Sequence, residues 1–398
     1  MKTPVYLDNH STTAVDRRVL EAMLPYFCEQ FGNAGSTSHA LGSQGKEAVD
    51  RARDQIATAI GATDQEIVFT SGATESNNLA IRGVADALGK KGRHLISVVT
   101  EHSAVLDPLE RLSRRDFEVT LLPVYPNSHL QVGQLDLERL RDSIRDDTIL
   151  VSVMLANNET GVIQPLSEIA ELCQSRGVIL HCDATQAIGK IPVDLNVIDI
   201  DLMSFSAHKF YGPKGVGALF VRRRTPKVRL VPLLDGGGQE GGRRSGTLNV
   251  PGIVGMGIAI ELAILEMSAD TARARRLRDR LYQGLTEQIS DCPLNGPFLD
   301  AGQGLDRLPG NLNMAFRFVD GESLMLSMGD LAVSSGSACT SARPEPSHVL
   351  RALGIAEDQV RASLRFGIGR FNTEEEIEFA IQTLIAAVER LRDLSSMA

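Results

Sequence analysis

The fold is decided by TILVSVML (148–155), PLSEIAELCQSR (165–176) and GVILHC (177–182), which follow one another along the chain. The first and last are short apolar runs rich in β-branched residues, which is typical of strands covered on both faces. The middle segment carries its apolar residues on one helical face and ends at Gly177, a residue that commonly stops a helix. Strand, helix and strand in this order predict two parallel strands joined by a helical crossover.

Further apolar runs extend this pattern outward in both directions. Between them lie amphipathic segments, so the whole region predicts a mostly parallel α/β sheet covered by helices. The additional predicted strands are EIVFT (66–70), HLISVV (94–99), DLMSFS (201–206) and GALFV (217–221).

The chain changes character after about residue 260, where longer helical patterns begin. We expect helices over 264–289 and 373–394, the second opened by a capping box between Thr373 and Glu376. This organisation predicts a large sheet domain over 16–261 and a smaller α+β domain built from 1–15 and 262–398. A cleft between two domains is where small molecules usually bind.

Composition excludes several classes of function. The 398 residues carry a formal net charge of −9, which gives no overall basic field for nucleic acid or an anionic membrane. The N-terminus lacks a signal-peptide pattern, and no run reaches the roughly 18 uninterrupted apolar residues of a membrane span, so a cytoplasmic protein is expected. Five widely spaced cysteines argue against a disulfide framework or paired zinc knuckles.

The segment SFSAHKFYGPKG (204–215) places Lys209 where a strand ends in a glycine-rich turn. Ligands of α/β sheets bind at such strand ends. A lysine desolvated there can form a Schiff base, while Ser206 and His208 offer a hydroxyl and an imidazole to a phosphate. The plainer interpretation is a surface lysine at a turn.

A second segment, EIVFTSGATESNN (66–78), joins a strand through small residues to a helix. Backbone N–H groups at the helix start, around Ala73 and Thr74, together with the Thr74 hydroxyl, would cradle a phosphate. The spacing matches neither common nucleotide-binding glycine motif, and a well-capped helix is an equal alternative.

A third segment, HCDATQAIGK (181–190), brings Asp183 to the end of an apolar strand, with Gln186 just after it. A buried carboxylate needs a cationic partner, and the pyridinium nitrogen of pyridoxal phosphate (PLP) is one. A metal cluster of His181, Cys182 and Asp183 is not expected, because adjacent strand residues point to opposite faces.

Three more residues are candidates from their context. Cys339 lies in VSSGSACTSARPEP (333–346), where small polar neighbours favour an exposed thiol, either a nucleophile or an incidental loop cysteine. His102 follows a strand and can lie against an aromatic cofactor, or it is a core histidine. Arg365 sits among apolar residues and needs an anion, either a structural carboxylate or that of a substrate.

Together these strings closely resemble the cysteine desulfurases of the IscS/NifS type, within the class V aminotransferase family of fold type I PLP enzymes. The similarity covers nearly the whole chain and keeps one order. It runs through YLDNHSTT (6–13), FGNAGSTSH (31–39), GATESNN (72–78), ANNETG (156–161), DATQ (183–186), SAHKFYGPKG (206–215), RRSGT (243–247), SSGSACTS (334–341) and LRFGIGRF (364–371).

The resemblance implies a role for each matching residue. Lys209 would form the Schiff base with PLP, Asp183 would pair with the pyridine nitrogen, Gln186 would contact the ring oxygen, and His102 would stack on the ring. Ala73, Thr74, Ser206 and His208 would hold the phosphate with Thr247 from the other subunit of a homodimer, Asn158 would contact cofactor and substrate, and Asn33 and Arg365 would bind the substrate carboxylate.

The implied reaction converts L-cysteine to L-alanine and leaves a persulfide on Cys339. Lys209 would remove the Cα proton, and His102 is a plausible base for activating the thiol. The sulfur would then pass to acceptor proteins such as an iron–sulfur scaffold, with tRNA thiolation as another destination. No resident metal is expected, although Cys339 is a candidate transient ligand of an iron–sulfur cluster.

The same motifs are also compatible with other functions. The nearest are a selenocysteine lyase or another class V aminotransferase, and one from a different class is a non-catalytic sulfur-pathway scaffold protein. Two positions depart from the usual pattern. Ala34 replaces a proline in FGNP and is expected to loosen the backbone there, and Gly367 stands where a serine is common.

Overall fold

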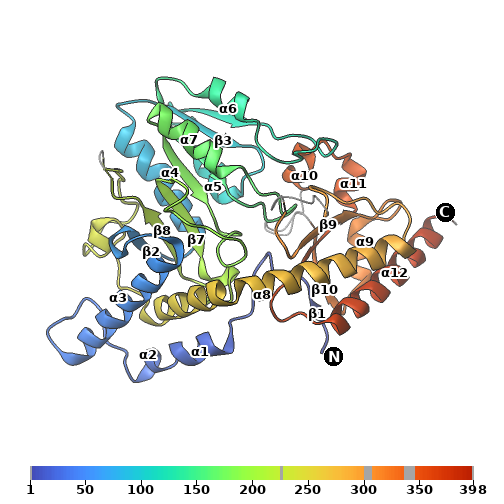
Figure 1. The fold of residues 1–398 in the computed structure, drawn as a ribbon, viewed down its shortest axis with the longest axis horizontal. Coiled ribbons are helices and arrows are strands. Elements are labelled where there is room, and N and C mark those ends of the chain that lie inside the picture. Colours follow the sequence, from blue (N-terminus) through green and yellow to red (C-terminus); the bar gives the residue numbers. More distant parts are fainter. Residues whose placement is uncertain (1, 225–226, 300–306, 336–345, 397–398) are drawn as a thin grey trace.

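The computed structural model describes residues 2–224, 227–299, 307–335 and 346–396, and it is built around a seven-stranded sheet (Figure 1). The strand order is β2-β8-β7-β6-β5-β3-β4, and β8 alone runs against its neighbours, so the prediction of a mostly parallel α/β sheet is confirmed. The strands are β2 (Ile67–Thr70), β3 (His94–Val98), β4 (Glu118–Leu122), β5 (Thr148–Met154), β6 (Ile179–Asp183), β7 (Leu202–Ser206) and β8 (Gly217–Val221).

Helices cover both faces of this sheet because the strands are apolar on both sides. In β2, for example, Ile67 and Phe69 join one core cluster, with α3, α7 and α8, whereas Val68 joins another, with α4 and α5. The helices of this part are α1 (Arg17–Met23), α2 (Pro25–Cys28), α3 (Ala40–Ile60), α4 (Ala73–Leu88), α5 (Ser103–Ser113), α6 (Leu137–Ser143), α7 (Leu166–Arg176) and α8 (Val250–Gln288).

The crossover predicted between the two central strands is present. Helix α7 ends at Gly177, whose φ of 63° lies in the left-handed region, and the Gly177 N–H donates to the carbonyls of Cys173 and Gln174. Glycine adopts this conformation without a Cβ clash. Strands β5 and β6, which precede and follow this helix along the chain, pair in parallel as predicted.

A second, smaller sheet has its own core. Its strands are antiparallel in the order β11 (Ser334–Ser335), β12 (Ser363–Gly367) and β9 (Asn311–Ala315), and β1 (Val5–Tyr6) pairs nearby with β10 (Leu331–Ala332). A separate cluster of buried side chains joins these strands to the end of α8 and to α12. The remaining helices are α9 (Gly321–Ser327), α10 (His348–Ala352), α11 (Glu357–Arg361) and α12 (Glu374–Ser396).

Helix α12 begins as predicted. The Thr373 N–H donates to the Glu376 carboxylate at 3.1 Å, and the Glu376 N–H donates to Thr373 Oγ1 at 3.2 Å, which completes the capping box. The helix extends two residues beyond the predicted end at 394.

Helix α8 differs from the prediction at its start. It begins at Val250, where Asn249 caps it, and it continues unbroken past 261–262, the expected boundary between the two domains. It lies along both sheets in Figure 1. By length and composition this helix could cross a membrane, but half of its most apolar window is buried in the protein and it packs on α3 and α12, which is the behaviour of a core helix.

Candidate active site

A pocket of about 590 Å³ opens beside the carboxyl ends of the central strands. This is the edge where open α/β sheets bind ligands. Many of the residues singled out from the sequence line it together, namely Ala73, Thr74, His102, Asn158, Asp183, Gln186, Ser206, His208 and Lys209. Residues separated by more than a hundred positions therefore meet in one cavity.

Lys209 reaches the pocket from the turn that follows β7. Its Nζ donates to two backbone carbonyls, that of His10 at 2.7 Å and that of Ser11 at 2.6 Å. These acceptors belong to the N-terminal segment 8–13, which also lines the pocket and to which the sequence analysis assigned no role. This segment contacts Lys209, which lies some 200 positions further along the chain, so a local sequence pattern could not predict the contact.

Asp183 ends β6 and is almost fully buried, with 6% of its surface exposed. Its Oδ2 accepts from Asn77 Nδ2 at 2.7 Å, and its Oδ1 accepts from the Thr185 N–H at 2.9 Å. Both bonds fix the orientation of the carboxylate in the pocket. Asn77 was missed by sequence reasoning, although it lies within GATESNN, on the helix whose start forms the predicted phosphate cradle.

Gln186 is held by two side chains behind it. Its Oε1 accepts from Lys190 Nζ at 2.7 Å and lies 3.1 Å from His10 Nδ1, while its Nε2 donates to the His10 carbonyl at 2.8 Å. Burial, together with the nearby cations Lys209 and Arg365, lowers the pKa of Lys190 to about 7. Neither Lys190 nor His10 was a candidate from the sequence.

His102 caps α5, and its Nδ1 accepts from the Ala104 N–H at 3.0 Å. Burial lowers its pKa, so the ring is neutral at pH 7 and carries its proton on Nε2. The preceding residue, Glu101, is fully buried, and its pKa is raised well above the usual value by burial. The nearby charge of Asp183 adds to this rise.

The residues predicted to cradle a phosphate line the same pocket. Helix α4 starts at Ala73, and Ala73 and Thr74 line the pocket together with Ser206 and His208. Burial, and the cations Lys209 and Lys214, lower the pKa of His208 to about 4, so its ring is neutral. Gly217 allows β8 to lie close to the residue before α4, since a Cβ on Gly217 would lie 2.6 Å from the Gly72 Cα.

Three candidates do not line this pocket. Arg365 is buried in β12, where it pairs with the structural carboxylate of Asp8 at 2.8 Å. Asn33 is exposed, and its Oδ1 accepts from the Gly35 N–H. Thr247 is exposed as well. Its assignment to the pocket of another subunit stays a prediction.

Cys339 lies in 336–345, outside the described residues, but the residues on both sides of that segment are placed. Ser334 pairs with Arg365 across β11 and β12, and the Arg365 guanidinium reaches the Asn158 carbonyl at 3.4 Å. On the other side, His348 Nε2 lies 2.9 Å from the Glu101 carbonyl, one residue before His102. The described residues Ser334 and His348 are therefore linked to the pocket residues Asn158 and His102 through Arg365 and Glu101.

Comparison with known proteins agrees with this geometry. Residues 5–379 match the family model described as aminotransferase class-V, and the chain belongs to this family. It is 54% identical, over 397 residues covering 100% of this chain and 95% of the relative, to a protein named cysteine desulfurase IscS from Anaeromyxobacter sp. (strain Fw109-5).

Solved structures give the same answer. A NifS-like protein superposes with a TM-score of 0.88 at 37% identity, covering 97% of this chain and all of that one. A structure titled SspA in complex with cysteine has a TM-score of 0.78 at 33% identity, covering 92% and 99%. The predicted fold type is thereby confirmed, and enzymes of this family depend on PLP.

The pocket fits that cofactor on the chemistry of its own side chains. It contains one amine on a strand-end turn, one buried carboxyl group and a helix start that can take a dianion. These match the three features of PLP that a protein must hold, which are the aldehyde, the pyridinium nitrogen and the phosphate.

Proposed function

We propose that this protein is a cysteine desulfurase, which converts L-cysteine to L-alanine and carries the sulfur as a persulfide on Cys339. The observation that carries the proposal is the meeting of Lys209 and Asp183 in one pocket. Ser334 and His348, described on either side of the Cys339 segment, contact Arg365 and Glu101, which in turn contact or precede the pocket residues Asn158 and His102. Support also comes from the relatives named cysteine desulfurase and from the similar structure in complex with cysteine.

We assign the cofactor contacts to residues that line the pocket and to Thr247, which does not line it. Asp183 would pair with the pyridine nitrogen, Gln186 would face the ring oxygen, and His102 would lie on the ring. The amides of Ala73 and Thr74, with the side chains of Thr74, Ser206 and His208, would hold the phosphate, Thr247 would be contributed by a second subunit, and Asn158 would contact cofactor and substrate.

The chain's own groups divide the reaction between them. PLP supplies an electron sink for the carbon that loses its proton. Lys209 takes that proton from the substrate Cα and returns one later. The Cys339 thiolate attacks the substrate sulfur, forming an S–S bond while the substrate C–S bond breaks, and protonation of the remaining three-carbon unit gives alanine.

The geometry changes the role that we assign to His102. A neutral imidazole whose Nδ1 already accepts a backbone N–H has its proton on Nε2, and such a ring donates a hydrogen bond there instead of removing a proton. We therefore assign it the task of stabilising a thiolate or delivering a proton, in place of the base expected from the sequence.

Arg365 remains our choice for the substrate carboxylate, with Asn33 as its proposed partner. The Arg365 Nε is buried and has no hydrogen-bond partner among the described residues, so the guanidinium retains a donor beyond its pair with Asp8. A carboxylate held there would share the cation with Asp8.

The test is incubation of the PLP-loaded protein with L-cysteine, followed by measurement of alanine and mapping of the persulfide. Equimolar alanine and sulfide-equivalents are expected, with the persulfide on Cys339. Cys339→Ala should lose desulfuration, whereas Cys28→Ala, which removes an exposed thiol outside the pocket, should retain it. Mercaptopyruvate production that survives Cys339→Ala would instead identify an aminotransferase, and a protein that takes up no PLP would support a scaffold role.

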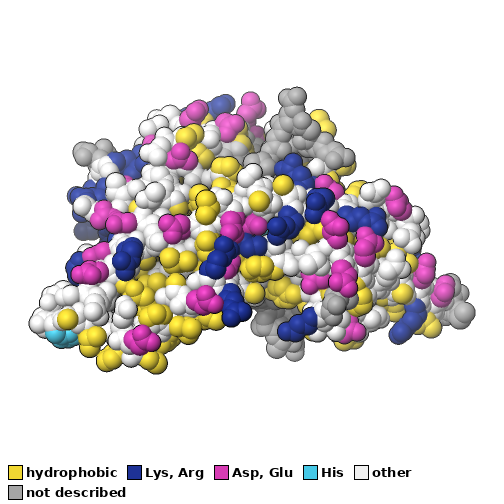
Figure 2. Space-filling model, turned by 60° about the horizontal axis from the view of Figure 1, so that its bottom comes forward, with side chains coloured by type: hydrophobic (Ala, Val, Ile, Leu, Met, Phe, Trp, Pro, Cys, Tyr) yellow, Lys and Arg dark blue, Asp and Glu magenta, His cyan; other side chains and the backbone are white. Residues whose placement is uncertain are grey.

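We also propose a homodimer and a division into two domains, the latter supported by the separate core of the smaller sheet. Figure 2 shows hydrophobic side chains gathered on the face that carries α1, α2 and the middle of α8. The large exposed apolar residues there are Leu20, Leu24, Phe27, Phe31 and Leu265. A face of this kind usually marks an interface. The sulfur acceptors are proposed to be proteins, such as an iron–sulfur scaffold.

A further inference from the structure

His10 is a buried residue of the N-terminal segment whose ring has no part in the proposed reaction. Its carbonyl accepts from Gln186 Nε2 at 2.8 Å, and its Nδ1 lies 3.1 Å from Gln186 Oε1. Because the carbonyl requires the amide nitrogen, the amide oxygen must face the ring, and this oxygen only accepts. The proton of the neutral ring therefore lies on Nδ1, and Nε2 carries a lone pair.

The Nε2 atom of His10 is a buried acceptor. Burial, together with nearby cations that include Arg365, lowers the pKa of His10 well below its ordinary value, so the ring keeps its lone pair at pH 7. Nε2 has no hydrogen-bond partner among the described residues. A buried acceptor without a partner is unfavourable, so a ligand that supplies a donor there gains affinity.

The imidazole of His10 lies on the same side of β12 as the side chain of Arg365. Gly367 follows Arg365 by two residues in this strand, so the two positions face the same side. A Cβ on Gly367 would lie 3.0 Å from His10 Cδ2, the ring carbon bonded to Nε2. Arg365 Nε is also buried without a partner among the described residues. An unpaired acceptor and an unpaired donor therefore share one side of the strand.

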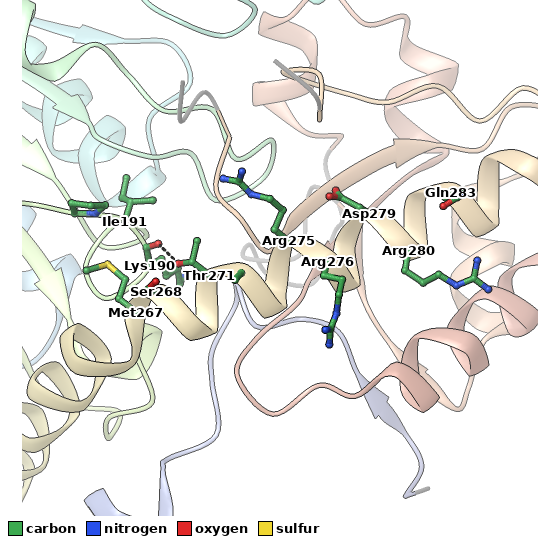
Figure 3. A pocket seen from close by; sticks show the side chains of 12 residues that line it. Lys190, Ile191, Met267, Ser268, Thr271, Arg275, Arg276, Asp279, Arg280 and Gln283 are labelled. Atoms are coloured by element: carbon green, nitrogen blue, oxygen red, sulfur yellow. Dashed lines mark hydrogen bonds between the residues drawn. The ribbon is translucent and has the colours of Figure 1, made fainter. Parts of the chain in front are cut away.

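His10 lines the cofactor pocket. A larger cavity of about 920 Å³ runs along α8, and its described lining includes Lys190 but not His10. The Lys190 carbonyl accepts from the Thr271 hydroxyl at the edge of this cavity, at 3.1 Å (Figure 3), while its Nζ donates to Gln186 Oε1 at 2.7 Å. Lys190 thus lies between the larger cavity and Gln186, so a ligand approaches His10 from the cofactor pocket.

A zwitterionic amino acid matches an acceptor and a donor placed in this way. Its α-ammonium donates hydrogen bonds, its carboxylate accepts them, and both groups are attached to one carbon. We propose that His10 is a further substrate-binding residue, whose Nε2 accepts a hydrogen bond from the α-ammonium of L-cysteine while Arg365 binds the carboxylate. The inference rests on the proposed function, which supplies the class of substrate and the role of Arg365.

Two substitutions separate the two nitrogens of the ring. Asparagine can place an N–H where Nδ1 lies, but it has no atom in place of Nε2. Glutamine can place its side-chain oxygen near the Nε2 position, but it has no donor in place of Nδ1. His10→Asn should therefore lose the contact with the ammonium, and His10→Gln should retain it.

Binding is measured by calorimetry on the PLP-loaded protein in a Cys339→Ala background, so that L-cysteine is not consumed. L-Alanine lacks the thiol, and 3-mercaptopropionate lacks the amino group. His10→Asn should weaken binding of L-cysteine and L-alanine about tenfold, because a hydrogen bond to a charged group is lost, and should leave binding of 3-mercaptopropionate unchanged. His129→Asn, at an exposed turn, should change none of the three affinities.

The other patterns of affinity would overturn the proposal. Equal weakening of all three compounds by His10→Asn would indicate a structural role, and weakening of L-cysteine and 3-mercaptopropionate alone would indicate a contact with the thiol. A loss in His10→Gln but not in His10→Asn would show that the ring acts through Gln186, and unchanged affinities in both variants would show that it has no role in binding.

His10→Gln decides the matter if His10→Asn takes up no PLP. Amino-acid affinities equal to those of the protein with His10 intact would support the proposal, and a tenfold loss would overturn it. A protein that shows the expected pattern but forms no persulfide with Cys339 intact would refute the proposed function and leave this inference standing.

Discussion

At the residue scale, the proposed catalytic and cofactor-binding side chains are oriented by neighbouring groups that take no direct part in the reaction. Asp183 is oriented by Asn77, and Lys209 is oriented by the carbonyls of His10 and Ser11. The catalytic types could be predicted, because an amine, a carboxylate and a helix start at strand ends point to one class of ligand. Their supports could not, because an asparagine or a backbone carbonyl carries no distinctive pattern in sequence.

Asn77→Ala should weaken the site by leaving Asp183 Oδ2 without its buried donor. A buried polar group left unpaired costs about 1–3 kcal/mol, so we expect a loss of that order in the free energy of unfolding and weaker PLP binding. Urea unfolding and a PLP titration measure the two effects. Asn78→Ala is the matched control, since Asn78 bonds the Thr74 carbonyl at an exposed position. Equal effects of the two variants would contradict the assignment.

Gly367 has a structural explanation that the sequence did not suggest. A Cβ at this position would lie 2.6 Å from the His10 nitrogen and 2.8 Å from the Asn9 nitrogen, so β12 can approach the N-terminal segment only without a side chain. The approach matters for the pocket, because the His10 carbonyl accepts from both Lys209 and Gln186. The serine common at this position therefore does not suit this chain.

Gly367→Ala should destabilise the protein by about 1–3 kcal/mol through overpacking, and should also lower PLP affinity. Gly329→Ala provides the control, because a Cβ there would meet nothing within 4 Å. Urea unfolding of both variants, with and without PLP, checks the prediction. A Gly367→Ala variant with unchanged unfolding free energy would show that the N-terminal segment moves aside freely.

At the scale of elements, the fully buried strands of the seven-stranded sheet were predictable, whereas β9 and β12 of the smaller sheet were not named although they are equally buried. Strand β4 was missed because it is partly exposed and its sequence, EVTLL, lacks a long apolar run. The start of α8 was missed because Pro251 and several glycines lower helix propensity there. Those glycines serve packing, since a Cβ at Gly257 would lie 2.9 Å from the Ala52 Cα of α3.

His181 links three strands and gives them a pH dependence. From β6 it bonds Ser152 of β5 at 2.8 Å and Ser204 of β7 at 3.0 Å, and burial lowers its pKa from 6.5 to about 4. Between those pH values the unfolded chain binds a proton that the folded chain refuses. Stability therefore falls as the pH drops through this window.

The expected contribution of His181 is about 3 kcal/mol lost between pH 7 and pH 4. Urea unfolding at both pH values should show that His181→Gln loses less stability over this range than the wild type, by roughly this amount. His129→Gln, at an exposed turn, should keep the wild-type difference. An unchanged pH dependence in His181→Gln would contradict the burial of a neutral ring.

At the scale of the whole molecule, the apolar face over α1, α2 and α8 predicts association. Phe27→Asp places a charge in this face and should convert a dimer to a monomer, because burying an unpaired carboxylate is costly. Light scattering after size exclusion measures the mass. Leu130→Asp is the control, since Leu130 is also a large exposed apolar residue, at 91%, but lies in the turn between β4 and α6. If Phe27→Asp remained dimeric, the dimer interface would have to lie on another face.

The pairing of Asn9 with Gly367 joins positions 358 apart, and it holds the strip of backbone that receives the Lys209 ammonium. During translation the N-terminal segment leaves the ribosome first. Strands β10 and β12, which pair with it, leave near the end. A nascent chain that already contains the lysine, the aspartate and the helix start consequently lacks the acceptors that aim the amine. Such long-range closure comes late in folding, so cofactor capture should follow release of nearly the full polypeptide.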